Sequence, residues 1–196
     1  VDFFIVFYSY FSGINLDEPN KNLNKLDPDV LPKLFMSKGH CYLAQLAALD
    51  TLFIDCNFSD NYLRVGTELF GHPKRDGSSK IFMVSSGSLG QGLAMANGAA
   101  LANKLREKND FIWSVIGDGE LNEGIVNEAI QFSAQNELRH IIVIDNNKQE
   151  SLDFTSEIIS NGDLEKRFSA YNVDYYSVDG HDLGLMLEIL PKLTSS

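Results

Sequence analysis

The segment FIWSVIGDGELNE, residues 111–123, is the most informative part of the sequence for predicting the fold. Residues 111–116 form an almost continuous apolar run, which is typical of a parallel strand covered on both faces. The run stops at Gly117, where a single aspartate stands between two glycines, and acidic and amide residues follow. Because Asp-Gly is ordinary turn chemistry, this segment alone predicts only a buried strand and a tight turn.

A second apolar run, HIIVIDN at residues 140–146, also ends in polar residues, Asn146 and Asn147. Residues 123–137, between the two runs, have a helical pattern, so strand, helix and strand predict one βαβ unit. Parallel strands place their carboxyl ends at the same edge of a sheet, where ligands bind in open α/β folds. The GDG segment and the asparagine pair are therefore expected to lie side by side.

Helical and strand-like patterns alternate along the rest of the chain. Residues 2–12 are expected to form a buried helix, although their aromatic content leaves a strand as the alternative. Further helices are expected at residues 39–53, 88–108, 164–171 and 182–193, and further strands at residues 34–37 and 173–178. Polar segments 15–33, 71–80 and 151–163 are expected to be connections. This alternation predicts one α/β domain over residues 1–196, with a mainly parallel sheet flanked by helices.

Composition excludes some classes of partner. The net charge is −11, with 27 acidic against 16 basic residues, which argues against nucleic acid or an anionic membrane because both are negative. The apolar segment 1–11 is too short to span a bilayer. Cys41 and Cys56 form no CxxC pattern, so we expect two reduced core residues and a cytoplasmic protein.

The two strand ends carry the residues of a metal and diphosphate site. Asp118 and Asn147 offer a carboxylate and an amide oxygen, which suit a hard divalent cation, Mg²⁺ or Ca²⁺. Such a cation would bring a diphosphate, and Gly117 and Gly119 would let the backbone approach it closely. The helix beginning near Asn122 would point free N–H groups at the same anion. Two unrelated turns are the alternative interpretation.

GDG followed by NN at this spacing resembles the signature of thiamine-diphosphate enzymes. SKGH (37–40), GHP (71–73), SSGSLGQG (85–92), GDGELNEG (117–124) and VDGHD (178–182) occur in the order seen in transketolases. The resemblance covers residues 2–193 and concerns the diphosphate-binding domain only. Pyruvate-dehydrogenase-type and deoxyxylulose-phosphate-synthase chains have different residues at the positions of SKGH and GSLGQG. The resemblance implies a three-layer thiamine-diphosphate-binding fold, with a mainly parallel sheet flanked by helices.

The resemblance also implies a role for each matching position at the strand ends. Asp118 and Asn147 would bind the metal, Mg²⁺ or Ca²⁺, through their side chains. Gln149 would bind it through its main-chain carbonyl. Gly117 and Gly119 would line the diphosphate of thiamine diphosphate.

Other matching positions would contact the coenzyme rings and the substrate. Gly87 and Leu89 would lie against the aminopyrimidine and thiazolium rings, and Leu89 would help to hold the coenzyme bent. His40 and His72 match histidines that face the coenzyme and the substrate. Helix capping is the alternative for His40, and a surface position in a Gly-His-Pro loop is the alternative for His72.

Among the acidic residues, Glu123 and Glu128 match those that link two thiamine sites through a subunit interface. Glu120 is expected to be no more than a first-turn carboxylate favoured by the helix dipole. His140 is expected to be structural or exposed, and His181 is expected to fix a turn.

Compared with the family, the chain is expected to be a diphosphate-binding domain that is truncated at both ends. The family's catalytic glutamate, which protonates the aminopyrimidine, belongs to a second, pyrimidine-binding domain. The chain is therefore expected to hold half of a coenzyme site. It would act only with a pyrimidine-binding partner, as a separate chain or a missing C-terminal domain, in a homodimer or heterotetramer.

The activity that the resemblance implies is transfer of a two-carbon ketol unit from a ketose, free or phosphorylated, to an aldose acceptor. Decarboxylative acyl transfer from a 2-oxo acid is one alternative that keeps the coenzyme. A non-catalytic subunit that retains the fold is the other alternative.

Overall fold

The computed structural model describes residues 1–16, 27–53, 56–67, 69–75, 80–150 and 153–195. Within them, the sheet has three parallel strands in the order β1-β2-β3, namely Lys33–Met36, Ile112–Gly117 and His140–Asp145. Most of the expected connection 15–33, and parts of those at 71–80 and 151–163, lie outside the described residues. The strands confirm the predicted parallel sheet, with β2 at its centre.

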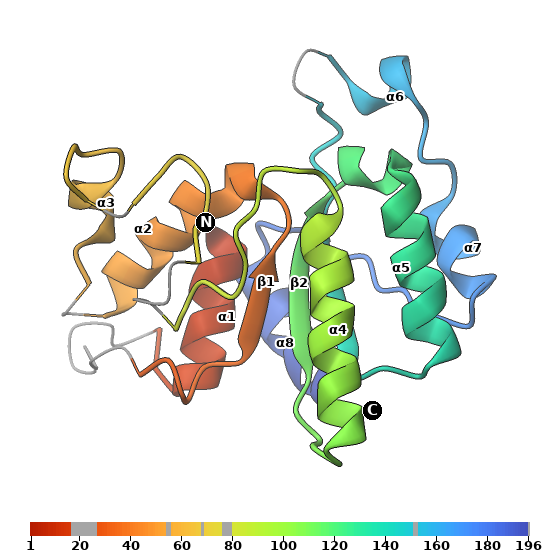
Figure 1. Ribbon diagram of the computed structural model, residues 1–196, viewed down its shortest axis with the longest axis horizontal. Helices are drawn as coiled ribbons and strands as arrows, with labels where there is room; N and C mark the ends of the chain where they lie inside the picture. The colour runs from red at the N-terminus through yellow and green to blue at the C-terminus, as the bar shows by residue number, and fades with distance from the viewer. Residues whose placement is uncertain (17–26, 54–55, 68, 76–79, 151–152, 196) are drawn as a thin grey trace.

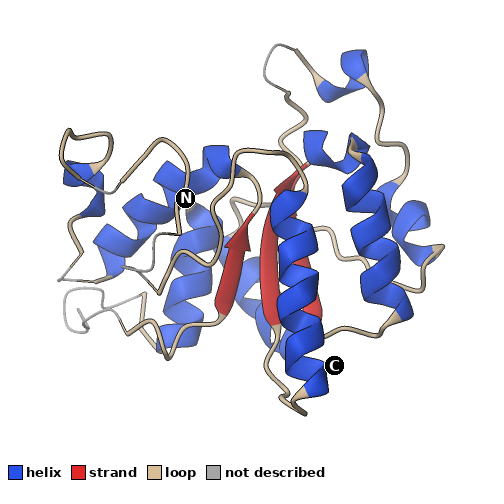
Figure 2. Cartoon of the chain, in the orientation of Figure 1, coloured by secondary structure: helices blue, strands red, loops and turns tan. Residues whose placement is uncertain are grey.

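Helices cover both faces of this sheet (Figures 1 and 2). The longer ones are α1 (Asp2–Ser12), α2 (Tyr42–Leu52), α4 (Gln91–Leu105), α5 (Gly124–Gln135) and α8 (Leu183–Thr194). The shorter ones are η2 (Gly39–Cys41), α3 (Phe58–Asn61), η3 (Gly119–Asn122), α6 (Thr155–Ile158) and α7 (Leu164–Ser169). In Figure 1, α4 lies in front of the sheet and α8 lies behind it, which gives three layers.

The side chains of β2 point alternately to the two faces of the sheet. Trp113 and Val115 are buried among side chains of α1, α2 and α8. Ile116 is buried on the other face, among side chains of α4 and α5. Every residue of β2 is buried, so the apolar run is a parallel strand covered on both faces, as predicted.

The N-terminal segment forms the helix α1 and not the alternative strand. Phe7 and Phe11 lie one helical turn apart, and their ring centroids lie 5.2 and 5.6 Å from that of Trp113. Gly13, at φ 71°, ends the helix in the left-handed conformation that glycine adopts readily. The aromatic contacts fasten α1 to the central strand.

The expected strand at residues 173–178 is wrong. These residues form no strand and pair with none in the part of the chain that the structure describes. Val173 and Tyr175 pack against the apolar cluster that contains Ile116, whereas Asp174 and Tyr176 are exposed. The alternating pattern therefore reflects one-sided burial of a non-strand segment, without the hydrogen bonds of a sheet.

Two further expectations need correction. The helix expected at residues 88–108 begins only at Gln91, because Gly90 has a left-handed φ of 77° and stands just outside it. The connection expected at residues 151–163 contains the single helical turn α6. No helix among the described residues has the length and apolar character needed to cross a membrane.

Candidate functional site

The polar segments expected at the ends of β2 and β3 do lie side by side. Gly117 is paired with Asp145 in the sheet, and the Asp118 N–H donates to the Asp145 carbonyl at 3.2 Å. On the other side of β2, the N–H of Lys38, just after β1, donates to the Val115 carbonyl at 3.0 Å. SKGH, GDG and the asparagine pair therefore meet at the carboxyl edge of the sheet.

Asp118 is a buried carboxylate, with 1% of its surface exposed. Its Oδ2 accepts from the Lys148 N–H at 2.8 Å and from the Thr155 hydroxyl at 3.1 Å. Its Oδ1 accepts from the Gly119 N–H at 3.0 Å. A buried carboxylate is tolerated only with such donors, and two oxygens with about four acceptor positions leave room for a further ligand.

The other predicted metal ligands stand in a turn against Asp118. Lys148, whose N–H binds the carboxylate, lies between Asn147 and Gln149 and has a left-handed φ of 60°. Asn147 and Gln149 are exposed, and the Asn147 Oδ1 accepts from the Gln149 N–H at 2.9 Å. The structure thus brings the backbone of residues 147–149 to Asp118, while the Asn147 oxygen is held within its own turn.

The oxygen atoms at this edge fit a hard divalent cation. Carboxylate, amide and main-chain carbonyl oxygens are the ligands of Mg²⁺ and Ca²⁺. Glu150 adds a buried carboxyl oxygen, Oε1, that has no hydrogen-bond partner among the described residues, and its Cγ would lie 3.1 Å from a Cβ placed on Gly119. The described residues contain no group of three or more His, Cys, Asp or Glu able to hold a metal. A cation beside Asp118 would therefore need neutral oxygens and those of its own ligand.

Glu120 is more than the first-turn carboxylate that its place in the sequence predicts. It is 2% exposed, and its Oε2 accepts from the Ser37 hydroxyl at 2.6 Å and from the Gly90 N–H at 2.8 Å. Its Oε1 accepts from the Gly117 N–H at 3.2 Å. One carboxylate therefore joins SKGH, GSLGQG and GDG. The sequence signal for this role was the position of an acidic residue directly after GDG.

The start of α4 is packed against the SKGH segment through a glycine. A Cβ on Gly92 would lie 2.7 Å from the Ser37 Cα, which leaves no room for a side chain. Gly90 is equally crowded, because a Cβ there would lie 2.6 Å from the Ile125 side chain. The glycines of GSLGQG thus bring the N-terminus of α4 close to the strand ends.

His40 and His72 come together beside this edge. Their ring centroids lie 5.4 Å apart, and the His72 ring packs so closely on Gly39 that a Cβ there would overlap it. His40 is exposed and His72 is partly exposed. Ser86 has a buried hydroxyl oxygen with no hydrogen-bond partner in the part of the chain that the structure describes, and this oxygen would lie 3.0 Å from the same Cβ. The pair predicted to face the substrate is therefore a pair in space.

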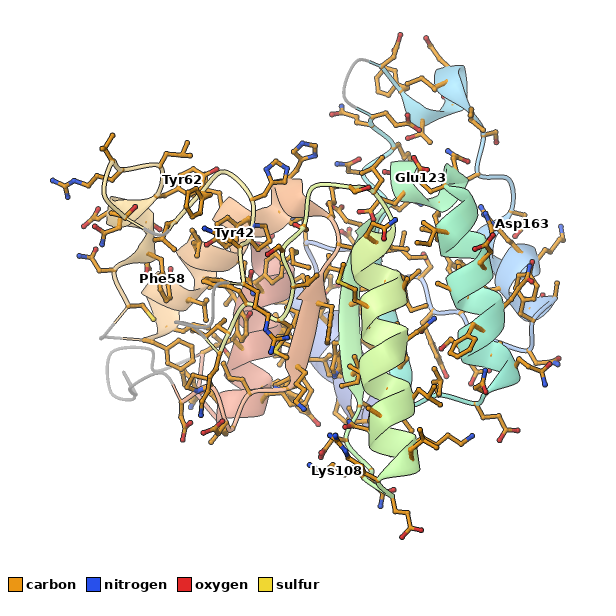
Figure 3. The ribbon with its side chains drawn as sticks, in the orientation of Figure 1. Tyr42, Phe58, Tyr62, Lys108, Glu123 and Asp163 are labelled. Carbon is orange, nitrogen blue, oxygen red and sulfur yellow. The ribbon has the colours of Figure 1, made fainter. Side chains whose placement is uncertain are left out.

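The remaining predicted residues lie on the surface around the start of α4 and α5. Gly87 has a φ of 153°, and Leu89 is 45% exposed. Glu123 is the N-cap residue of α5, and Glu128 lies one turn further; both are exposed. Figure 3 shows Glu123 at the end of the molecule where α4 begins, with Lys108 at the opposite end.

Two histidines have other partners. The His140 ring stands at the start of β3 between Ser114 and Asn97, at 2.9 and 2.8 Å, and burial lowers its pKa to about 4. The His181 Nδ1 lies 2.8 Å from the Asp2 carboxylate, on the surface. Its N–H also donates to Asp179 at 2.9 Å, which fits the expected role in a turn.

Comparison with known proteins gives the family. Residues 9–190 match the family described as "Transketolase, thiamine diphosphate binding domain". The chain is 34% identical to the 6-deoxy-6-sulfo-D-fructose transketolase subunit SqwG of a Clostridium species, over 88% of this chain and 62% of that protein. It is 30% identical to an apulose-4-phosphate transketolase subunit of Actinobacillus succinogenes, over 94% of this chain and 65% of that protein.

Solved structures agree on the fold. The transketolase of Leishmania mexicana matches with a TM-score of 0.75 and 20% identity, over all of this chain and 34% of that chain. The transketolase of Campylobacter jejuni matches with a TM-score of 0.75 and 23% identity, over all of this chain and 35% of that chain. This chain spans less than two thirds of the curated relatives described above. The chain belongs to the transketolase family, and the part of that family that it matches is the thiamine-diphosphate-binding domain.

Proposed function

We propose that this chain is the diphosphate-binding half of a transketolase-like transferase. The enzyme moves a two-carbon ketol unit from a ketose or ketose phosphate to an aldose acceptor. The observation that supports this best is the meeting of SKGH, GSLGQG and GDG on the single carboxylate of Glu120, next to Asp118. The names of two relatives, which concern a sulfosugar and a sugar phosphate, support a sugar substrate.

In this proposal, the strand ends hold thiamine diphosphate through a divalent metal, Mg²⁺ or Ca²⁺. Asp118 and Asn147 bind the cation through their side chains, and Gln149 binds it through its carbonyl. The Asn147 oxygen leaves the Gln149 N–H, which it contacts at 2.9 Å, to do so. Gly117 and Gly119 line the diphosphate, and Gly87 and Leu89 support the rings. When bound, the coenzyme supplies a nucleophilic carbon and an electron sink.

His40 and His72 are the residues we assign to the sugar. The two nitrogens of an imidazole ring can donate and accept hydrogen bonds, which suits contact with the hydroxyl groups of a sugar. The 5.4 Å between the two ring centroids lets both rings contact one small substrate. Their partial exposure keeps the pair open to a ligand from solvent.

The partner in this proposal is a pyrimidine-binding half, which supplies the glutamate for the aminopyrimidine ring. It is a separate chain or a further domain, in a heterotetramer or a homodimer. The exposed carboxylates of Glu123 and Glu128 are available for the interface between halves. The name "subunit" in two relatives supports a divided enzyme. The sequence has only two cysteines, Cys41 and Cys56, and they form no CxxC pattern, which supports a reducing compartment, so we place the enzyme in the cytoplasm.

Asn147→Ala in the complete assembly tests the metal site. Because Asn147 is exposed, the variant should fold as the wild type does and lose one metal ligand. We expect Mg²⁺-dependent binding of thiamine diphosphate to weaken by about 10-fold or more, as measured by calorimetry. Glu188→Gln, an exposed position on α8, is the matched control and should bind normally. Unchanged binding by Asn147→Ala would contradict the assigned site.

Substrate consumption by the same assembly separates the possible reactions. We expect xylulose 5-phosphate to be consumed in the presence of an aldose acceptor, and pyruvate to remain. Consumption of pyruvate alone would contradict ketol transfer and would indicate decarboxylative acyl transfer. Absence of metal-dependent coenzyme binding in the complete assembly would indicate a non-catalytic subunit.

A further inference from the structure

Lys38 crosses the carboxyl edge of the sheet from β1 to β3. It follows β1 directly, and its Nζ donates to the Asp145 Oδ2, at the end of β3, at 2.7 Å. Its methylene groups run over Gly117 of β2, where a Cβ would lie 3.2 Å from the Lys38 Cδ and 3.4 Å from its Cε. Lys38 therefore occupies the space above a residue that we assign to the diphosphate.

The Lys38 ammonium has donors to spare. An ammonium carries three N–H donors, and in the part of the chain that the structure describes Asp145 is its one acceptor. The side chain of Asp145 is 41% exposed and that of Lys38 is 14% exposed. Water therefore reaches the pair, and Asp145 stays solvated if the ammonium turns to another partner.

The same edge carries more negative than positive side chains. Asp118, Glu120, Asp145 and Glu150 all lie around Gly117 and Gly119. Carboxylates repel a diphosphate unless cations stand between them. A divalent cation at Asp118 would supply part of the positive charge. The Lys38 ammonium supplies a further positive charge on the β1 side of the site.

We propose that Lys38 is a direct ligand of the coenzyme's diphosphate, an inference that rests on the proposed function. In the coenzyme-free protein, the ammonium is paired with Asp145. When the coenzyme binds, the ammonium donates to a diphosphate oxygen, and water replaces it at the Asp145 carboxylate. A compact charge on a flexible stem suits this exchange, and lysine is a regular phosphate ligand for that reason.

A purely structural role for the ion pair predicts a different pattern of mutant effects. If the pair only holds β1 to β3, removing either charge breaks the same contact and has the same effect on coenzyme binding. If Lys38 is a ligand, removing its charge weakens binding. Neutralising Asp145 then leaves the ammonium free for the diphosphate, so binding is kept or strengthened.

The test is a calorimetric titration of thiamine diphosphate, with Mg²⁺, into the complete assembly of this chain with its pyrimidine-binding partner. Lys38→Met keeps an apolar stem over Gly117, and we expect it to weaken coenzyme affinity by about 10-fold or more. Asp145→Asn should bind as tightly as the wild type or more tightly. Lys108→Met, at the opposite end of the molecule (Figure 3), controls for the loss of one positive charge and should bind normally.

Salt dependence gives a second readout. Screening weakens a lysine–phosphate contact, so wild-type affinity should fall more steeply with salt than that of Lys38→Met. Thermal unfolding establishes whether each variant is folded. If Lys38→Met is not folded, Lys38→Arg, which keeps the charge, is used in its place. In that case Lys38→Arg should keep most of the affinity and the salt dependence.

Two results would overturn the inference while the proposed function stands. One is equal weakening in Lys38→Met and Asp145→Asn, and the other is no weakening in Lys38→Met, each with a wild type that binds the coenzyme. If Lys38→Arg is the variant used, a complete loss of coenzyme binding would also overturn the inference. A wild-type assembly that does not bind the coenzyme would overturn both the inference and the proposed function.

Discussion

His140 links the protonation of one residue to the stability of the sheet. The Asn97 Nδ2 donates to the Ala129 carbonyl at 2.6 Å, so its Oδ1 faces the His140 ring and the Nδ1 carries the hydrogen. The Nε2 is then the acceptor for the Ser114 hydroxyl. Burial lowers the pKa of His140 from 6.5 to about 4, because the charged form is poorly solvated there.

Stability should therefore fall in mild acid. The folded-state pKa lies below the unfolded value, so the unfolded chain takes up the proton first as the pH falls. The contribution of the neutral ring is complete above pH 6.5 and is lost progressively between pH 6.5 and 4, by at most about 3 kcal/mol. Urea unfolding at a series of pH values measures it. His140→Gln should lose this dependence and the exposed His181→Gln should keep it; equal profiles for wild type and His140→Gln would contradict the assignment.

Single residues differ in how far sequence could predict their place in the site. The position of Asp118 at the carboxyl edge of the sheet was predictable, because two apolar runs both end in polar residues and parallel strands end at the same edge. Glu120 was not, because its partners Ser37 and Gly90 come from distant parts of the chain. The spacing of GDG and NN also could not predict that the Asn147 oxygen turns to the Gln149 N–H.

At the scale of elements, the contact between α4 and the segment after β1 depends on one glycine. Gly92→Ala would place a Cβ 2.7 Å from the Ser37 Cα, so we expect α4 to shift and unfolding to become easier by about 1–3 kcal/mol. In Gly98→Ala, on the same helix, the new Cβ would meet no described residue within 4 Å, and the variant should stabilise the protein by about 0.5–1 kcal/mol. Urea titrations of both variants measure the difference, and two changes of the same sign would contradict it.

Elements were predictable where one local pattern had one structural outcome. The apolar run of β2 required two covered faces. For residues 2–12 the aromatic content also allowed a strand, and the structure shows a helix in which Phe7 and Phe11 both contact Trp113. The strand prediction for residues 173–178 was wrong because an alternating apolar pattern reports which side chains are buried and not whether the backbone pairs with another strand. Val173 and Tyr175 are satisfied by the cluster around Ile116, so the pattern is met without a neighbouring strand.

At the scale of the whole molecule, the proposed function makes this chain one half of the coenzyme site. We expect the isolated chain to bind thiamine diphosphate with Mg²⁺ at least about 100-fold more weakly than the complete assembly, because only the diphosphate would be enclosed. Calorimetry on the chain with and without its pyrimidine-binding partner measures the difference. Equal affinity in the two experiments would mean that this chain encloses the coenzyme by itself.

The buried carboxylate of Glu120 has a consequence for how this part of the site folds. Its three donors belong to Ser37, Gly90 and Gly117, which lie far apart along the chain and converge only when β1, β2 and α4 are all in place. If any one of these segments moved away, the Glu120 carboxylate would lose a hydrogen-bond donor while it remained buried, which is energetically costly. The residues at the carboxyl edge of the sheet should therefore fold and unfold cooperatively with the rest of the domain.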